Sequence, residues 1–146
     1  MRRFLTAAAP AVALIPAAAL AVALIPGAAG LAGANPIPGP PFVERAEWVH
    51  WGDLSSLRVY PTSSARNVSV QVGTAAQADE AWVEVLTLAP DAAIPGMREQ
   101  FLCHWNFAEM AEPGKTSWNL EPWRPEVDET QMVSARCNPG GTEEPF

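Results

Sequence analysis

The residues best suited to chemistry lie in one short segment, WNLEPWRP (118–125), which combines two indole rings, an amide, a carboxylate and a guanidinium. Pro122 and Pro125 fix their own φ angles and push the residues before them into extended geometry, so we expect a stiff segment. Stiffness holds side chains in fixed relative positions, as a recognition surface requires. The predicted binding residues are therefore Trp118, Asn119, Glu121, Trp123 and Arg124.

The same segment also has a structural interpretation. Its two tryptophans would seal the edge of a small core, and Arg124 would stack on one of them while pairing with Glu121. The chain has six tryptophans, of which Trp82 and Trp105 are predicted core residues. The other four tryptophans would suit sugar stacking if they formed an exposed row, but not if they were buried. These are Trp48, Trp51, Trp118 and Trp123.

His104 is a second possible centre of chemistry. With Glu121 and Arg124 it could act as acid, base or anion clamp, provided that the three share a concave pocket. The sequence contains no glycine-rich phosphate loop and no hydrolase nucleophile elbow. Two isolated histidines are too few for a metal site, so we expect neither a metal nor another cofactor. The three residues are weak catalytic candidates, and whether the protein is an enzyme stays open.

The two cysteines, Cys103 and Cys137, predict a disulfide if the protein works in an oxidising compartment. Such a bond closes a loop of about 35 residues and removes roughly 3.5–4 kcal/mol of freedom from the unfolded chain. The alternative is a catalytic thiol at Cys103 activated by His104. Adjacent residues in a strand point to opposite faces, so their adjacency supports this alternative weakly.

Residues 1–34 have the pattern of a signal peptide. Arg2 and Arg3 precede a long uncharged run rich in Ala, Val, Leu and Ile, and Ala32-Gly-Ala34 supplies a small-residue cleavage site. We expect export by the general secretion route with cleavage after Ala34, and no stable membrane anchor after cleavage. An uncleaved anchor and a twin-arginine route are the alternatives, since the run is long enough to span a bilayer.

The charge of the mature chain excludes several partners. Without Arg2 and Arg3, 7 basic residues face 16 acidic ones, which gives a formal net charge of −9. Nucleic acid demands a basic face, and so does attachment to anionic lipids. We therefore expect neither partner, and interpret the acidity as a solubility feature.

The remaining sequence predicts a proline-rich linker (35–41), a single globular domain (42–137) and a flexible tail (138–146). Thr74–Ala89 has a capping-box pattern and an apolar stripe at helical spacing, which predict the main helix; Pro90 ends it. The residues before it predict a helical or irregular segment (43–51) and then two strands, 57–61 and 67–72, paired through a turn at 62–66.

Beyond the main helix, the alternation in 101–107 predicts a strand with Phe101, Cys103, Trp105 and Phe107 on one face. A turn at 112–115 and a returning partner strand at 116–120 would complete a hairpin. The segment 128–137 fits a short helix slightly better than a strand. The predicted fold class is α+β: a small antiparallel sheet packed on one main helix and pinned by one disulfide.

Four blocks of the chain carry a resemblance to a known family: AWVEV (81–85), PDAAIPGMREQFLCHW (90–105), WNLEPWRP (118–125) and RCNPGG (136–141). From about Trp51 to Gly141 the chain resembles the exported actinobacterial proteins grouped as domain of unknown function 2599. The resemblance implies an exported protein of mycobacterial or related type, without an established activity to transfer. By analogy, the Cys-His and Cys-Asn-Pro blocks support the disulfide.

These observations favour a non-enzymatic, exported domain that binds a protein or glycan ligand of the cell envelope or extracellular space. The alternative is a small secreted hydrolase or toxin that uses His104 with Glu121 and Arg124. A passive structural or inhibitory role is the third possibility.

Overall fold

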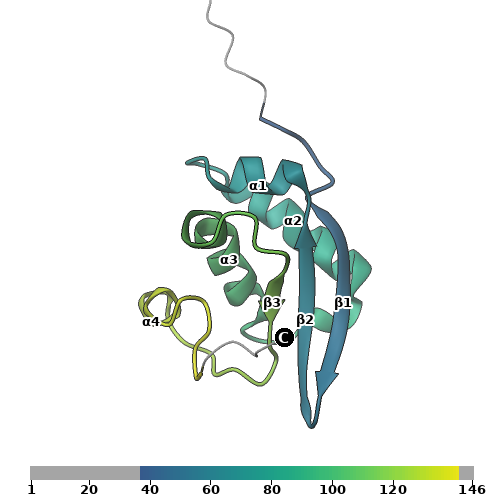
Figure 1. The fold of residues 1–146 in the computed structure, drawn as a ribbon, viewed down its shortest axis with the longest axis vertical. Coiled ribbons are helices and arrows are strands. Elements are labelled where there is room, and N and C mark those ends of the chain that lie inside the picture. Colours follow the sequence, from purple (N-terminus) through teal and green to yellow (C-terminus); the bar gives the residue numbers. More distant parts are fainter. Residues whose placement is uncertain (1–36, 142–146) are drawn as a thin grey trace, which may run out of the picture. The chain divides into compact units, whose positions relative to one another are not determined.

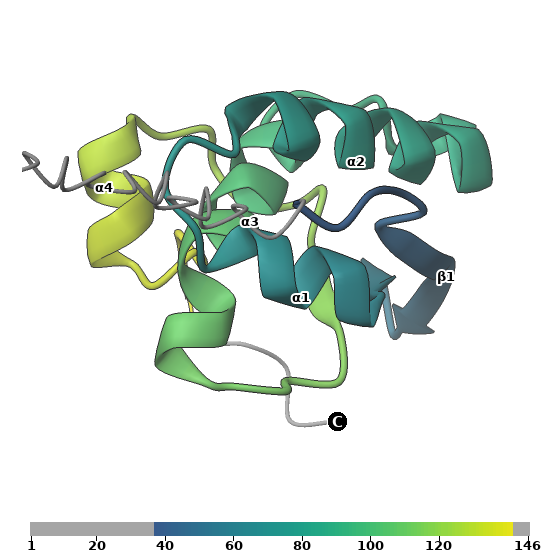
Figure 2. The same ribbon diagram turned by 90° about the horizontal axis from the view of Figure 1, so that it is seen from above.

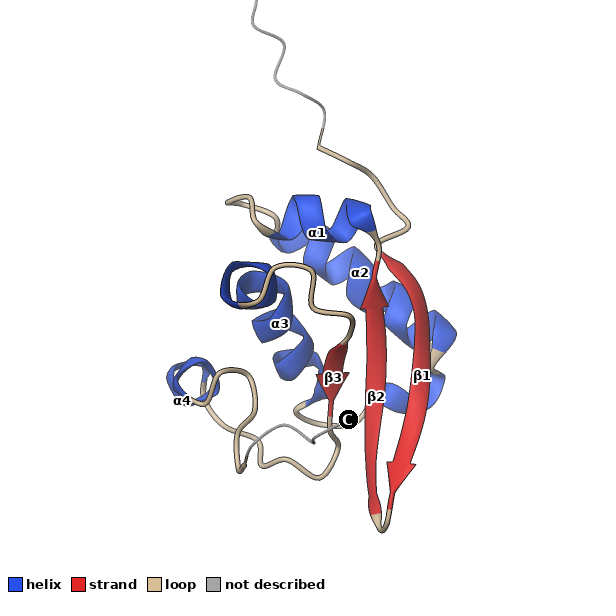
Figure 3. Ribbon diagram, in the orientation of Figure 1, coloured by secondary structure: helices blue, strands red, loops and turns tan. Residues whose placement is uncertain are grey.

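A long antiparallel hairpin lies along one side of the fold (Figures 1 and 3). In the computed structural model, which describes residues 37–141, β1 (Val43–Trp51) pairs with β2 (Leu54–Pro61) over their whole length. Only Gly52 and Asp53 separate the strands, and the φ of +57° at Gly52 suits a residue without a Cβ. The predicted leader (1–34) and the end of the predicted tail (142–146) lie outside the described residues.

A third, short strand completes the sheet. β3 (Trp118–Leu120) pairs antiparallel with the other edge of β2, so that Val59 faces Trp118 and Leu57 faces Leu120. The strand order is β1-β2-β3. The segment 118–125 therefore begins as a sheet strand.

Helices and one 3₁₀ turn complete the described fold. They are α1 (Ser63–Ser69), α2 (Ala75–Leu88), the single 3₁₀ turn η1 (Pro90–Ala92), α3 (Met97–Ala111) and α4 (Glu129–Ser134). α2 packs against β1 and α3 against β3, while α4 packs against α3 (Figures 1 and 2). The predicted α+β class, with an antiparallel sheet and one disulfide, is confirmed.

Aromatic side chains fill the space between the sheet and the helices. Phe101 and Trp105 of α3 meet Trp118 of β3, with ring centroids 5.9 and 6.1 Å from the Trp118 ring. Phe42 packs edge-on against Trp105, and Trp82 lies against Phe101. The predicted core positions of Trp82 and Trp105 are confirmed, because both side chains are buried.

The prediction of a strand at 101–107 was wrong, since these residues belong to α3. The alternation of large apolar residues holds for only seven positions, whereas a helical stripe runs through the whole element. That stripe consists of buried residues spaced three or four apart: Met97, Gln100, Phe101, His104, Trp105 and Ala108. The predicted hairpin with 116–120 fails for the same reason, and β3 pairs with β2 instead.

Two predictions before the main helix were also wrong. The segment 43–51 is a strand, and its aromatic and β-branched residues before a Gly-Asp turn were the signal for one. Of the predicted strand 67–72, the first three residues belong to α1 and the other three follow it; residues 63–66 also lie in α1, so the predicted turn at 62–66 does not exist. Thr62 caps α1 by accepting a hydrogen bond from the Ala65 amide, and Ala65 and Val68 are buried.

The predicted helices at 74–89 and 128–137 are present as α2 and α4. Asp128 caps α4 by accepting a hydrogen bond from the Gln131 amide. The capping box at Thr74 was wrong, because its hydroxyl makes no bond to the helix. It instead accepts from Trp105 Nε1 at 3.2 Å and donates to the Gln71 carbonyl, which ties α2 to α3.

The disulfide between Cys103 and Cys137 joins the middle of α3 to the residues after α4. Both cysteines are buried and, with Met132 and Val127, form a small apolar cluster apart from the main core. There is thus no free thiol at Cys103, which removes the alternative of a catalytic cysteine. α4 depends on this bond because it contributes little to the main core.

The double variant Cys103→Ala/Cys137→Ala is expected to lose roughly 3.5–4 kcal/mol of unfolding free energy, the entropy of closing a loop with a separation of 34 residues. Urea unfolding of the oxidised domain measures the loss. Reductant should bring the wild type to the level of the variant and leave the variant unchanged. A loss below about 1 kcal/mol would show that the loop is already closed by other contacts.

Candidate binding surface

The structure places most of the segment 118–125 inside the protein. Trp118 is 1% exposed and packs in the core, while Asn119, Glu121 and Arg124 are 5%, 0% and 4% exposed. Trp123 is half-buried, and the Arg124 guanidinium lies 4.6 Å from the centre of its ring. Because Trp118 is buried, the four tryptophans considered for sugar stacking do not form an exposed row. A binding role for the five predicted residues stays a prediction.

Glu121 and Arg124 form an ion pair with no solvent exposure of either side chain. Arg124 Nε donates to Glu121 Oε2 at 2.6 Å, and the Ser56 hydroxyl of β2 donates to Glu121 Oε1 at 3.0 Å. Arg124 Nη1 also donates to the carbonyl oxygens of Pro139 and Gly141. The pair therefore ties the chain after β3 to β2 and to residues 139–141.

The side chain of Gln100 connects this pair to α3. Its amide donates to the Glu121 carbonyl oxygen at 3.0 Å and accepts from the Glu121 amide at 2.9 Å, as a neighbouring strand would. Gln100 is itself 1% exposed. The carboxylate and guanidinium that looked available for binding or catalysis thus hold together four parts of the fold.

His104 lies on α3 apart from these contacts. Its Nε2 is 3.1 Å from the Asn119 carbonyl oxygen, and since a carbonyl oxygen only accepts, Nε2 carries a proton and donates it. His104 is 4% exposed and lines a groove to which neither Glu121 nor Arg124 contributes. The arrangement required of the three catalytic candidates, a shared concavity, is not present in that groove.

Exposed apolar side chains gather around the outer side of α3. Nine large apolar side chains are exposed among the described residues, and five of them line grooves beside this helix: Val70, Val72, Phe107, Met110 and Val133. Leu102 lies among them at the centre of the helix. These six residues are called the α3 surface below.

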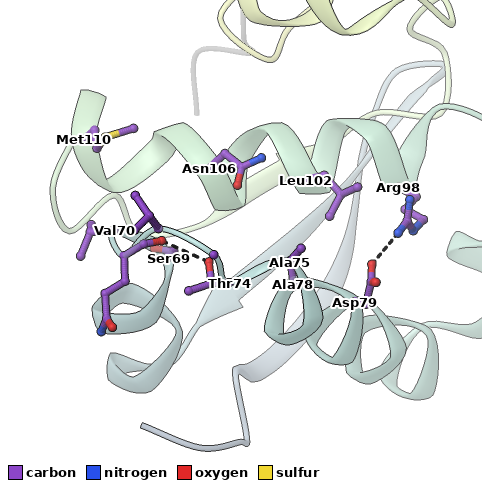
Figure 4. A pocket seen from close by; sticks show the side chains of 13 residues that line it. Ser69, Val70, Thr74, Ala75, Ala78, Asp79, Arg98, Leu102, Asn106 and Met110 are labelled. Carbon is purple, nitrogen blue, oxygen red and sulfur yellow. Dashed lines mark hydrogen bonds and ion pairs between the residues drawn. The ribbon is translucent and has the colours of Figure 1, made fainter. Parts of the chain in front are cut away.

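The first groove lies between α3 and the loop that joins α1 to α2, and is called the loop groove (Figure 4). It has a volume of about 590 Å³. Leu102 and Asn106 line it from α3, and Val70 and Ala78 line it from the other side. An ion pair of Arg98 with Asp79, 2.5 Å between Nη2 and Oδ1, closes one end. Apolar and uncharged polar side chains line the rest of the groove, and the ion pair balances the charges at this end.

The second groove lies between α3 and α4 and is called the α3–α4 groove. It has a volume of about 300 Å³ and shares Leu102 and Asn106 with the loop groove, so the two meet on the same helix. Phe107, Val127 and Val133 make it apolar, while its only charged lining residues are Glu99 and Glu129. The rim is therefore negative.

The third groove, of about 600 Å³, is called the disulfide groove because both cysteines line it. Its charged lining residues are Glu112, Lys115 and Arg136, and His104 lies in its wall. Within residues 37–141, no three potential metal ligands come together. None of the helices in this range is long and apolar enough to cross a membrane.

The sequence prediction missed the α3 surface because it treated 101–107 as a strand. With helical spacing, Leu102, Asn106 and Met110 lie four residues apart on one face, opposite the buried stripe. That signal was present in the sequence. The contributions of Val70 and Val133 come from other helices and could not be inferred from spacing along α3.

Comparison with known proteins gives a family without an assigned activity. A model of the family described as "Protein of unknown function (DUF2599)" matches residues 43–140. The uncharacterised proteins Rv0477 of Mycobacterium tuberculosis and Mb0487 of Mycobacterium bovis are each 55% identical over 111 residues, 76% of this chain and 74% of theirs. ML2452 of Mycobacterium leprae, also uncharacterised, is 48% identical over 103 residues, 70% of this chain and 83% of its own. No solved structure matches.

Replacing Arg124 with methionine is expected to cost about 3–5 kcal/mol of unfolding free energy, because it leaves a buried carboxylate without its partner. The matched control is Arg98→Met, which breaks the Asp79 pair with side chains 44% and 61% exposed and should cost less than about 1 kcal/mol. Urea unfolding of both variants measures the difference. Equal losses would mean that the Glu121–Arg124 pair is not a principal support of the fold.

Proposed function

We propose that this chain, which belongs to the DUF2599 family, is an exported, non-enzymatic domain that binds a partner protein through the α3 surface. The observation that carries the proposal is the concentration of exposed apolar side chains along two joined grooves on α3. Contiguous exposed apolar surface is unfavourable in water, so its presence on a soluble domain is typical of an interaction site.

The position of the apolar side chains supports docking by an extended or helical segment. Val70 and Met110 lie at the loop groove, and Phe107 and Val133 lie at the α3–α4 groove. A segment that crosses α3 at Leu102 would therefore bury anchors in both grooves. Apolar anchors spaced along an amphipathic segment are a recurrent mode of recognition in such grooves.

The charge at the grooves favours a basic partner. Glu99 and Glu129 line the α3–α4 groove without a basic lining residue to balance them, and the exposed Asp128 directly precedes Glu129. Basic side chains beside the apolar anchors of the partner would complement this rim. We therefore assign the surface to a basic, amphipathic segment of another envelope or secreted protein.

The non-enzymatic part of the proposal follows from how the three candidate catalytic groups are used. The Glu121 carboxylate and the Arg124 guanidinium are fully buried and satisfy each other, Ser56 and two carbonyl oxygens. His104 donates from Nε2 to a backbone carbonyl oxygen. A general acid or base must reach its substrate, and the buried pair offers no such access.

Export is supported by the leader pattern of residues 1–34 and by the disulfide, which persists in oxidising compartments.

When the full chain is expressed in a mycobacterial host, the protein is expected in the culture filtrate or envelope fraction with Asn35 as its first residue. N-terminal sequencing reads this directly. A protein in the envelope fraction that begins at residue 1 would instead indicate a retained anchor, and a cytosolic protein would contradict export.

The α3 surface is expected to bind a short amphipathic helical peptide of leucine and lysine with micromolar affinity, and the affinity should fall as salt is added. Met110→Lys, which removes an anchor and adds repulsion, is expected to weaken binding about tenfold, equivalent to about 1.4 kcal/mol. Titration calorimetry with the mature domain measures both affinities.

The matched control is Val83→Lys on α2. Val83 is 61% exposed and Met110 62%, and both variants change the net charge equally, but Val83 lines neither groove. Equal weakening by the two variants would mean that the peptide follows net charge rather than the α3 surface, and would overturn the proposal. Equal binding of a peptide with glutamate in place of lysine would overturn the assignment of a basic partner.

A further inference from the structure

The disulfide groove collects positive charge in a domain that is otherwise strongly acidic. Lys115 and Arg136 line it together with one carboxylate, Glu112. The Lys115 ammonium pairs with Glu112 Oε2 at 3.8 Å. Two basic lining residues and one acidic one give the groove a formal excess of positive charge in a chain with a formal charge of −7.

Arg136 occupies a backbone position that favours glycine. The amide of Cys137 donates to the Met132 carbonyl and that of Arg136 to the Val133 carbonyl, which is the pattern of a Schellman motif at the end of α4. Arg136 takes the left-handed position of this motif with a φ of +53°, and Cys137 follows at +66°. Glycine would adopt this conformation without the steric penalty that a Cβ brings.

The side chain of Arg136 has no ion-pair partner among residues 37–141. Other arginines of this part of the chain are paired, Arg66 with Glu109, Arg98 with Asp79 and Arg124 with Glu121. An exposed, unpaired guanidinium thus lines a groove from a position where glycine would fit better. Within residues 37–141, its positive charge therefore has no structural role in an ion pair.

Apart from the charged residues, His104 and Asn138, the lining is apolar. Phe107 and Ala108 on α3, Ala111 at its end and Val133 on α4 line the groove together with the disulfide. Its volume, about 600 Å³, is within the range of small-molecule sites. We propose that the disulfide groove binds an amphiphilic anion: a small molecule with one acidic group, held by Arg136, on an apolar body that lies along Phe107 and Val133.

The test is a titration of the mature, oxidised domain with sodium octanoate and with octyl phosphate, followed by amide chemical shifts in NMR spectra. We expect saturable shifts at the lining residues with at least one of the two probes, and the tighter probe identifies the acidic group. Inorganic phosphate lacks the apolar body and octanol lacks the acidic group, so each is expected to bind at least tenfold more weakly than the tighter probe.

Variants of Arg136 separate ligand binding from folding. Arg136→Gln should weaken binding of the tighter probe about tenfold, as expected for the loss of a charge-assisted contact, while Arg136→Lys should retain most of it. Arg136→Gly should also lose binding, yet keep the melting temperature of the wild type or raise it by up to about 5 °C, because it relieves the left-handed strain. Arg98→Gln in the loop groove is the control and should leave binding unchanged.

Several results would overturn the proposal. They are the absence of saturable shifts with both probes, equal affinity for octanol or for inorganic phosphate, or an unchanged affinity of Arg136→Gln. Phe107 and Val133 belong to both the α3 surface and the disulfide groove, whereas Met110 lines the loop groove alone. Met110→Lys should accordingly bind the probes as the wild type does, so that this proposal and the proposed peptide surface can fail separately.

Discussion

The ion pair between Glu121 and Arg124 is the constraint on which the fold depends. Two opposite charges removed from water are tolerated only when they satisfy each other and nearly every remaining hydrogen-bonding group. Here Ser56 supplies the second carboxylate contact and two carbonyl oxygens of the C-terminal segment occupy the guanidinium. Neither charge can be changed alone, so the pair fixes the relative positions of β2, the end of β3 and residues 139–141. Through Gln100 the same constraint extends to α3.

This use of charge explains why the residue types best suited to chemistry do not form an open site. The stiff segment WNLEPWRP was predicted either to bind a ligand or to complete the core. In the structure, Arg124 stacks on Trp123 while pairing with Glu121, and Trp118 lies among the core aromatics. The fold thereby positions α3 with its aromatic stripe inward and its opposite side in solvent. The face of α3 that does not pack in the core stays exposed, and it carries the proposed α3 surface.

The accuracy of the sequence prediction differed between two helices of similar length. α2 was predicted correctly because its apolar stripe at helical spacing and the terminating Pro90 both indicate a helix, although the capping box predicted at Thr74 does not form. α3 was predicted as a strand because Phe101, Cys103, Trp105 and Phe107 alternate, although Cys103 packs in a separate cluster and Phe107 is exposed. The helical stripe becomes visible only over the full length from Met97 to Ala108. The ion pair, the grooves and the left-handed backbone at Arg136 depend on contacts between distant segments, which periodicity along the chain cannot reveal.

The attachment of α4 makes two of the three grooves depend on the disulfide, and therefore on the redox state of the compartment. Met132 and Val133 of this short helix line the α3–α4 groove, and Val133 also lines the disulfide groove. Six residues of helix are too few to be stable alone, and α4 lies outside the main core, so the Cys103–Cys137 bond supplies much of its attachment. Reduction would loosen a wall of both grooves at once while the main core remained. A chain without the disulfide would therefore keep its core and the loop groove but lose a wall of the other two grooves, so the proposed functions require an oxidising compartment.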